Sequence, residues 1–238
     1  MGMLKTFMKK SFNSAGYDIM RLSNNPMHTF LGLRTLPIRS VIDVGANVGQ
    51  FGRSIKKIFP DSKIYCFEPL PEPFKKLGKW AITCQGNVEV FNMALGEKED
   101  EVEMFFHVDH SASSSLLKST ECNENLYPFM RKQVSTAIKM STLDHIFAES
   151  PDSLANEILI KIDTQGYEDR VIKGGSEVFS RARACILEIN LYALYEGQAS
   201  FNNIVQLLND KGFNYQGNLS QMYSNDGHVM YLDAVFIR

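Results

Sequence analysis

The sequence is poor in cysteine, and its cysteines are not spaced for disulfides or metal binding. Four occur in 238 residues, none in a CxxC pair, and Cys66 and Cys185 lie inside apolar runs. Buried, reduced thiols are the simplest interpretation. This argues against a disulfide-stabilised secreted scaffold and against a zinc site, and we predict no metal.

Long apolar runs and a basic excess are also missing. No stretch is long enough to span a bilayer, and the first residues lack the continuous apolar segment of a signal peptide. A cytoplasmic location is therefore expected. The formal net charge is −2, which gives no electrostatic reason to expect a nucleic-acid partner.

Charge is nevertheless distributed unevenly along the chain. Residues 1–39 contain six basic residues and one acidic residue, a net charge of +5, so the remainder carries −7. We therefore predict a basic N-terminal helical arm over residues 1–39 and a single domain over residues 40–238.

The first residues of this arm have the spacing of an amphipathic helix. Packing of the apolar face on the domain is the interpretation we favour. A weak contact with a membrane surface and a cover over the mouth of a cleft are the alternatives. The apolar face consists of five residues: Met3, Leu4, Phe7, Met8 and Phe12.

From residue 40 onward, strand-like and helix-like segments alternate. This alternation predicts an α/β fold with a mostly parallel sheet and helices on both of its faces. Helices are expected at residues 49–59, 73–82, 168–173 and 201–211. Strands are expected at residues 40–44, 63–67, 88–93, 157–163, 184–189, 213–216 and 232–237.

Two departures from this alternation are informative. No helix separates the last two strands, so they should pair antiparallel and give the sheet one reversed C-terminal strand. Residues 96–156 contain two strand-like segments, 101–106 and 134–140, around a long polar loop. We interpret this region as an insertion near the mouth of the cleft.

The stretch VIDVGANVGQF (residues 41–51) joins the first strand to the first helix of the sheet. In such sheets ligands bind at the carboxyl ends of the strands. Gly45 and Gly49 let the backbone approach a ligand, and the helix directs its free N–H groups toward it. A dinucleotide motif, GxGxxG, needs glycine where Asn47 stands. That argues against an NAD-dependent oxidoreductase, which remains an alternative.

Two carboxylates end neighbouring strands. Glu68 closes the second strand, where a carboxylate can accept hydrogen bonds from a ribose diol. Its alternative role is that of a surface carboxylate before a proline. Asp43 closes the first strand, where it can cap the following helix or hold an ammonium group of a cofactor.

Four motifs in order resemble the FkbM family of S-adenosylmethionine-dependent methyltransferases. They are VIDVGANVGQF, CFEPLPEPF (66–74), NMALG (92–96) and LIKIDTQGYEDRVIKGG (159–175). The resemblance implies a Rossmann-like class I methyltransferase sheet with a reversed seventh strand. It also implies transfer of a methyl group to a hydroxyl oxygen, often on a sugar, glycan or related metabolite. A cofactor-binding module without catalysis is a further alternative.

The resemblance also implies which residues bind S-adenosylmethionine. The turn from Asp43 to Gly49 would hold the methionine part, Glu68 would hold the ribose, and the NMALG motif would lie near the adenine. The serine pair before a leucine in the inserted loop, Ser114 and Ser115, would touch the cofactor or the acceptor; a solvated polar loop is the alternative. The full implied set is Asp43, Gly45, Ala46, Asn47, Gly49, Glu68, Pro69, Asn92, Met93, Ala94 and Ser114.

The fourth strand, EILIKID (residues 157–163), is apolar except near its end, and Lys161 is its unexpected residue. By alternation Lys161 and Asp163 share a face. A buried lysine is costly unless it is paired, so a structural ion pair with Asp163 or Glu188 is one interpretation. A catalytic role beside the cleft is the other.

An alcohol must lose its proton when its oxygen is methylated, and the oxygen must lie in line with the methyl donor. Asp163, Glu168 and Glu188 are the candidate bases. Lys161 can steady a developing alkoxide or tune a neighbouring carboxylate. An alternative for Glu168 is a first-turn carboxylate that complements the helix dipole. The run DTQG lacks the Asn/Asp-Pro-Pro-Tyr element of many enzymes that methylate nitrogen.

Overall fold

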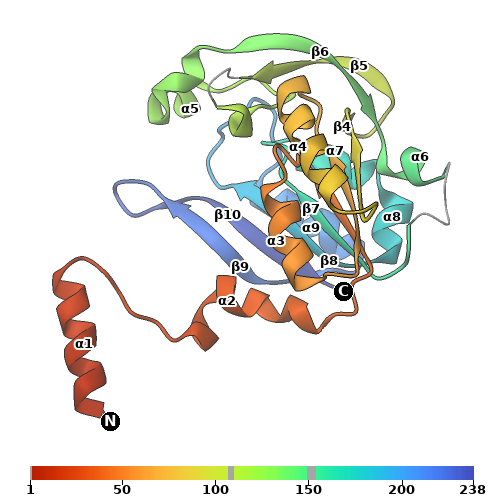
Figure 1. The fold of residues 1–238 in the computed structure, drawn as a ribbon. Coiled ribbons are helices and arrows are strands. Elements are labelled where there is room, and N and C mark those ends of the chain that lie inside the picture. Colours follow the sequence, from red (N-terminus) through yellow and green to blue (C-terminus); the bar gives the residue numbers. More distant parts are fainter. Residues whose placement is uncertain (1, 107–109, 149–153) are drawn as a thin grey trace.

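The protein is built on one seven-stranded sheet (Figure 1). The computed structural model describes residues 2–106, 110–148 and 154–238, with side chains from residue 6 onward. The strand order is β3-β2-β1-β7-β8-β10-β9. The strands are β1 (Ser40–Val44), β2 (Lys63–Phe67), β3 (Val88–Phe91), β7 (Ile158–Ile162), β8 (Ala182–Asn190), β9 (Asn214–Tyr223) and β10 (Val229–Ile237).

Pairing within this sheet is mostly parallel. Strands β1, β2, β3, β7 and β8 pair parallel with one another, whereas β10 pairs antiparallel with both β8 and β9. The predicted fold class, a mostly parallel sheet with one reversed C-terminal strand, is therefore confirmed.

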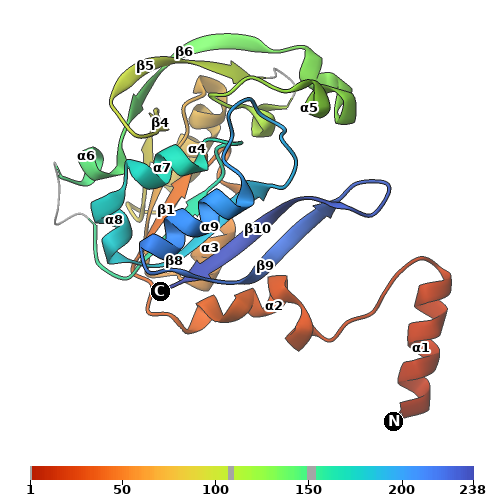
Figure 2. The same ribbon diagram turned by 180° about the vertical axis from the view of Figure 1, so that it is seen from behind.

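Helices cover both faces of the sheet, as predicted (Figures 1 and 2). Alternation along β1 explains the two layers: Val41 packs with Ile55 and Leu77 on one face, and Ile42 packs with Val171 on the other. The first face carries α3 (Gln50–Ile58) and α4 (Pro71–Thr83). The second carries α7 (Glu168–Lys173), α8 (Ser176–Arg181) and α9 (Phe201–Asp210).

The region between β3 and β7 forms a second sheet of three strands, in the order β4-β6-β5. Residues 107–109 and 149–153 of the predicted insertion lie outside the described residues, and the predicted domain boundaries stay a prediction. The strands are β4 (Ala94–Leu95), β5 (Asp100–Phe106) and β6 (Val134–Ser141). Short helices accompany them: η3 (Ser111–Ser113), α5 (Glu121–Leu126), η4 (Pro128–Arg131) and α6 (Leu143–Ala148).

Several strand boundaries differ from the prediction. β9 runs to Tyr223 instead of residue 216, and β10 begins at Val229 instead of residue 232. We expected the third strand to run to residue 93, but β3 ends at Phe91 and residues 94–95 join the second sheet. Asn92 causes the break, because its side-chain amide donates to the backbone oxygens of Glu68 and Pro69, both at 2.9 Å.

The first helix, α1 (Gly2–Ser14), stands away from the rest of the molecule in both views (Figures 1 and 2). Our expectation that its apolar face packs on the domain is wrong, because Phe7, Met8 and Phe12 are exposed. Phe30 and Leu33 of η2 (Phe30–Thr35) fill the core position instead. The preceding turns are η1 (Leu22–Asn24) and α2 (Pro26–Thr29).

No helix in the described part of the chain has both the length and the apolar character needed to cross a membrane.

Candidate active site

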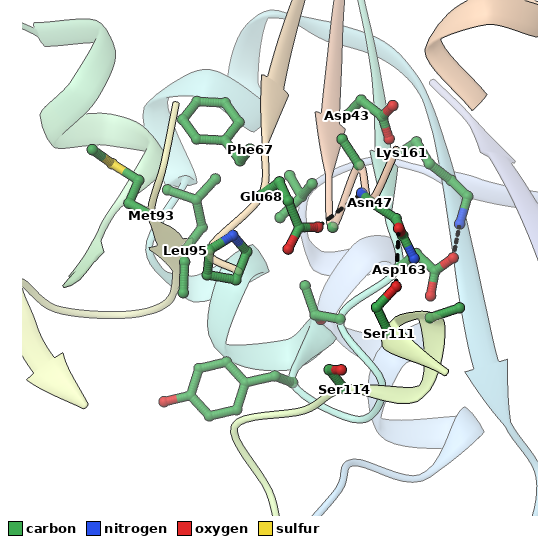
Figure 3. Close-up of a pocket in the computed structure, with 18 of the residues that line it drawn as sticks. Asp43, Asn47, Phe67, Glu68, Met93, Leu95, Ser111, Ser114, Lys161 and Asp163 are labelled. Atoms are coloured by element: carbon green, nitrogen blue, oxygen red, sulfur yellow. Dashed lines mark hydrogen bonds and ion pairs between the residues drawn. The ribbon is translucent and has the colours of Figure 1, made fainter. Parts of the chain in front are cut away.

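A cavity of about 210 Å³ opens at the carboxyl ends of β1, β2 and β7 (Figure 3). The inserted segment at residues 111–116 forms the facing wall. Most of the residues predicted from the sequence line this cavity: Asp43, Gly45, Ala46, Asn47, Glu68, Pro69, Met93, Ala94, Ser114, Lys161 and Asp163. Four predicted residues are not part of its lining: Gly49, Asn92, Glu168 and Glu188.

The turn after β1 is packed too tightly for any residue but glycine at position 45. Gly45 has a φ of +78°, and a Cβ there would lie 1.9 Å from the backbone oxygen of Asp163. The N–H groups of Gly45 and Ala46 both donate to the backbone oxygen of Phe67, at 3.0 and 2.9 Å. The backbone of this turn is therefore fixed against both neighbouring strands while it lines the cavity.

Gly49 belongs to the same turn but does not line the cavity. Its φ is +87°, and a Cβ would come within 2.9 Å of the Trp80 ring on α4. Gly49 thus sets how closely α3 approaches α4, and it directs the start of α3 toward the cavity.

Glu68 is a buried carboxylate held by two backbone donors. The N–H of Asn47 donates to Oε2 at 2.8 Å (Figure 3). The N–H of Leu70 donates to Oε1 at the same distance, 2.8 Å. Burial raises the pKa of Glu68 to about 7, although these two hydrogen bonds oppose the rise. Each oxygen keeps a lone pair for a further donor. Asn92, by bonding the backbone of Glu68 and Pro69, fixes this geometry rather than touching the cavity.

Asp43 lies deeper, at the end of β1. Its carboxylate lies near Gly52 in the first turn of α3, but Gly49 is the N-cap of that helix and no side chain caps it. Oδ2 of Asp43 is buried and has no hydrogen-bond partner among the described residues, which favours the alternative role of holding an ammonium group. Burial raises the pKa of Asp43 to about 7, and the ammonium of Lys161 opposes this rise.

Lys161 is buried and lies among partly buried carboxylates of β8, β10 and the turn after β7. Its Nζ is 3.3 Å from Oδ2 of Asp163 (Figure 3). The same atom is 3.7 Å from Oδ1 of Asp233 on β10. Burial opposes the charge on Lys161, but the surrounding carboxylates outweigh burial and raise its pKa. The ion pair with Asp163 predicted as one alternative is present, and it lies on the cavity wall.

Gln165 joins two of these carboxylates. Its Nε2 donates to Oδ1 of Asp163 at 2.9 Å and to Oε1 of Glu188 at 2.6 Å. The hydroxyl of Tyr195 donates to Oε1 of Gln165 at 2.8 Å. Burial raises the pKa of Glu188 to about 8, with Asp163 adding to the rise. Glu188 therefore reaches the cavity only through Gln165 and Asp163.

Glu168 has a different set of contacts. Its Oε1 accepts from the N–H and the hydroxyl of Thr164, at 3.1 and 3.0 Å, and from the N–H of Gly166 at 3.1 Å. These bonds hold the turn between β7 and α7. A catalytic role for Glu168 stays a prediction, and its contacts favour the structural alternative.

The inserted segment is tied to the sheet by serines. The hydroxyl of Ser111 donates to Oδ1 of Asn47 at 3.3 Å, and that of Ser115 donates to the backbone oxygen of Gln165 at 2.7 Å. Ser114 lies between them, buried on the cavity wall, and its hydroxyl has no hydrogen-bond partner among the described residues. That hydroxyl is available to a bound molecule.

Sequence reasoning missed several residues of this site. Gln165 was not given a role in the charge group, and Asp233 and Tyr195 lie in later elements with no motif of their own. Ser111 lies in a polar loop without periodicity, so no local signal marked it. Tyr167, which together with Gln165 was expected to line the acceptor pocket, does line the cavity. Other lining residues missed are Gln50, Phe51, Phe67, Leu95, Met104, Ala112, Leu116 and Thr164.

Comparison with known proteins agrees with this geometry. Residues 43–215 match the model of the methyltransferase FkbM domain, which is more than half of the chain. The chain belongs to the FkbM methyltransferase family. The FkbM match runs from the end of β1 into β9, so it includes the whole cavity. It argues against the NAD-dependent alternative.

Two curated relatives are similar to this FkbM chain at low identity. The 2-O-methyltransferase NoeI of Sinorhizobium fredii is 25% identical over 71% of this chain and 70% of that protein. The 31-O-demethyl-FK506 methyltransferase FkbM of Streptomyces tacrolimicus is 26% identical over 76% and 75%, respectively. Among solved structures, a SAM dependent methyltransferase from Aquifex aeolicus aligns with a TM-score of 0.44 and 14% identity, over 93% of this chain and 94% of that one.

The FkbM family implies S-adenosylmethionine as the methyl donor, and the cavity residues fit this molecule. Gly45 lets the turn lie directly against the backbone of Asp163, so that the backbone of the turn lines the cavity. Glu68 presents a fixed carboxylate to a pair of hydroxyl groups, and Ser114 offers an unpartnered hydroxyl. Among the described residues there is no group of three or more metal-ligating side chains arranged to hold a metal ion, and the predicted independence from metal stays a prediction.

Proposed function

We propose that this chain is an O-methyltransferase that uses S-adenosylmethionine and methylates a hydroxyl group of a sugar, a glycan or a related small metabolite. The observation that carries the proposal is the fixed carboxylate of Asp163 on the cavity wall, oriented by Gln165 and paired with Lys161. The names of the relatives NoeI and FkbM both describe transfer to oxygen, which supports the same reaction.

The cofactor side of the cavity has a division of roles. Glu68 accepts hydrogen bonds from the ribose hydroxyl groups. The methionine part lies against the backbone of the turn from Gly45 to Gly49. Met93 and Ala94 pack beside the adenine, and Ser114 donates to or accepts from the bound molecule. When bound, S-adenosylmethionine supplies an electrophilic methyl group on a positively charged sulfur.

The acceptor side needs a base, and Asp163 is our candidate. Its carboxylate takes the proton from the acceptor hydroxyl as the oxygen is methylated. Gln165 and Glu188 are positioning residues, because they hold Asp163 without lining the cavity wall as it does. Lys161 stabilises the negative charge that develops on the acceptor oxygen.

The local charge balance supports a cationic methyl donor. Asp43, Asp163, Glu188 and Asp233 all act on the single ammonium of Lys161. Four carboxyl groups around one ammonium favour an added positive charge nearby. We expect S-adenosylmethionine to bind more tightly than neutral-sulfur S-adenosylhomocysteine at pH values where these carboxyl groups are ionised.

The test is a transfer assay with a labelled methyl donor and a panel of saccharides, lipid-linked glycans, hydroxylated metabolites and RNA. We expect label on a hydroxyl oxygen of one acceptor class. Asp163→Asn should lower kcat at least about 100-fold while cofactor binding by calorimetry is retained. Asp61→Asn, an exposed matched control, should leave kcat unchanged.

Three outcomes would count against the proposal. They are a lack of S-adenosylmethionine binding, label found on nitrogen or RNA, and an Asp163→Asn variant as active as the parent protein.

A further inference from the structure

Helix α1 is a basic helix, and three of its apolar side chains, Phe7, Met8 and Phe12, are exposed. Phe7 is 69% exposed, and Met8 and Phe12 are each 46% exposed. The helix sequence, GMLKTFMKKSFNS, contains three lysines and no acidic residue. Both views show the helix apart from the sheet and its covering helices (Figures 1 and 2).

The exposed apolar surface continues beyond the helix. The backbone reverses at Gly16, which has a φ of +83° and ends α1. Large apolar side chains then follow in a segment that the core does not cover. Single exposed apolar residues are ordinary, but eight of them within residues 7–27 indicate an interaction surface. The eight are Phe7, Met8, Phe12, Tyr17, Ile19, Met20, Leu22 and Met27.

Charge identifies the kind of partner that fits this surface. Residues 1–39 carry a net charge of +5, and the remainder of the chain carries −7. An anionic surface therefore attracts the arm and repels the body. An anionic surface with an apolar layer beneath it can form ion pairs with the lysines and can bury the exposed aromatic side chains.

The helix has the layout for lying in the plane of such a surface. At 100° per residue, Phe7, Met8 and Phe12 fall within one half of the helix, and Lys9 and Lys10 fall in the other. Lysine stems can extend so that their ammonium groups stay at the phosphate level. With thirteen residues α1 is too short to span a bilayer, so it would lie along the surface.

We propose that residues 2–27 dock on an anionic phospholipid surface, with the apolar face of α1 inserted below the headgroups. One short helix gives reversible attachment. The arm joins the amino end of β1, whereas the cavity opens at the carboxyl end of the same strand. The docked arm therefore leaves the cavity open to an acceptor.

The test is co-sedimentation of the full chain with vesicles that contain phosphatidylglycerol and with vesicles of phosphatidylcholine alone. We expect binding to the anionic vesicles.

Each lysine near an anionic surface contributes a factor of about five to the binding constant, so Lys9→Gln/Lys10→Gln should weaken binding about 25-fold. Phe7→Ser/Phe12→Ser should weaken it as well, and both pairs are exposed, so folding should be unaffected. Lys76→Gln/Lys79→Gln removes the same charge from exposed positions on α4 and should change nothing.

The proposal is overturned by absent binding, by equal binding to neutral and anionic vesicles, or by binding that the arm variants do not change. It is also overturned if light scattering finds a dimer that Phe7→Ser/Phe12→Ser dissociates, because the apolar face then belongs to a second copy. Vesicle binding does not depend on methyl transfer, so the result is independent of the proposed enzymatic function.

Discussion

Glu68 accepts one backbone hydrogen bond on each carboxylate oxygen, so its amide counterpart cannot take its place. In Glu68→Gln the side-chain NH₂ would face the N–H of Asn47 or Leu70, and an acceptor for the ribose would be lost. The hydrogen bond that the charged carboxylate accepts from the ribose is worth about 2 kcal/mol. We expect the affinity for S-adenosylmethionine to fall about 30-fold or more, measured by calorimetry.

The matched control for this change is Glu72→Gln, an exposed carboxylate in the first turn of α4. Its cofactor affinity should equal that of the parent protein. An unchanged affinity in Glu68→Gln would contradict the ribose role.

Gly45 tests how tightly the cofactor turn is packed. An alanine at this position would bring its Cβ to 1.9 Å from the Asp163 backbone oxygen, at a φ that side chains rarely adopt. We expect Gly45→Ala to lower the melting temperature and abolish cofactor binding, as measured by scanning fluorimetry with and without S-adenosylmethionine.

Gly78→Ala is the opposite case, because nothing lies within 4 Å of a Cβ in the middle of α4. That change should stabilise the protein by up to about 1 kcal/mol. If Gly45→Ala melted and bound cofactor like the parent protein, the described packing of the turn would be wrong.

Residues near the glycine turn could be predicted from the sequence because their signals are local. Gly45 and Glu68 follow directly after apolar runs, where parallel strands end. Asp233 and Tyr195 could not be predicted, because their partners are distant in the chain and only the sheet order brings them together. Gln165 lies in the turn directly after β7, but a sequence gives no information about which two carboxylates one amide will join.

At the scale of elements, Ser115 connects the inserted segment to the turn after β7. Its hydroxyl donates to the backbone oxygen of Gln165 at 2.7 Å and accepts from the N–H of Leu117 at 3.0 Å. Ser115→Ala leaves both buried groups without this partner, at a cost of about 1–3 kcal/mol. We expect faster amide exchange in residues 111–117 and 164–166, measured by mass spectrometry.

Ser54→Ala is the control for this element, because its hydroxyl bonds the helix backbone at an exposed position of α3. Exchange in both segments should stay at the level of the parent protein. The two segments would be independent if Ser115→Ala changed neither of them.

Most strands and helices of the main sheet lie where the sequence predicted them, since apolar periodicity is strong in buried elements. The ends were less predictable. β3 stops early because of the Asn92 side chain, and the two-residue β4 is too short to have a periodicity. The position of α1 was predicted wrongly. Amphipathic spacing indicates that a helix has an apolar face, but it does not indicate which part of the protein, if any, packs on that face.

At the scale of the whole molecule, three buried carboxyl groups link stability to pH. Burial raises the pKa of Asp43 and Glu68 to about 7 and that of Glu188 to about 8. The folded state therefore binds more protons than the unfolded state between about pH 5 and about pH 8. Stability should fall as pH rises through this window and level off above it.

Melting temperatures in scanning fluorimetry at a series of pH values check this sign. In the double variant Glu68→Gln/Glu188→Gln, the melting temperature should fall less with rising pH than in the parent protein. In Glu72→Gln it should fall as much as in the parent protein. Bound S-adenosylmethionine should stabilise the protein more at the alkaline end, since its ribose favours ionised Glu68. A melting temperature that rose steadily from about pH 5 to about pH 8 would contradict the assignment.

The position of β10 has a consequence for biosynthesis. It is the last strand of the described chain to leave the ribosome, yet it lies inside the sheet between β8 and β9. Until it emerges, β8 presents an open edge to other nascent chains, and the ammonium of Lys161 lacks Asp233. A chain terminated before residue 229 should therefore be a substrate for chaperones and proteases and not a weakened enzyme.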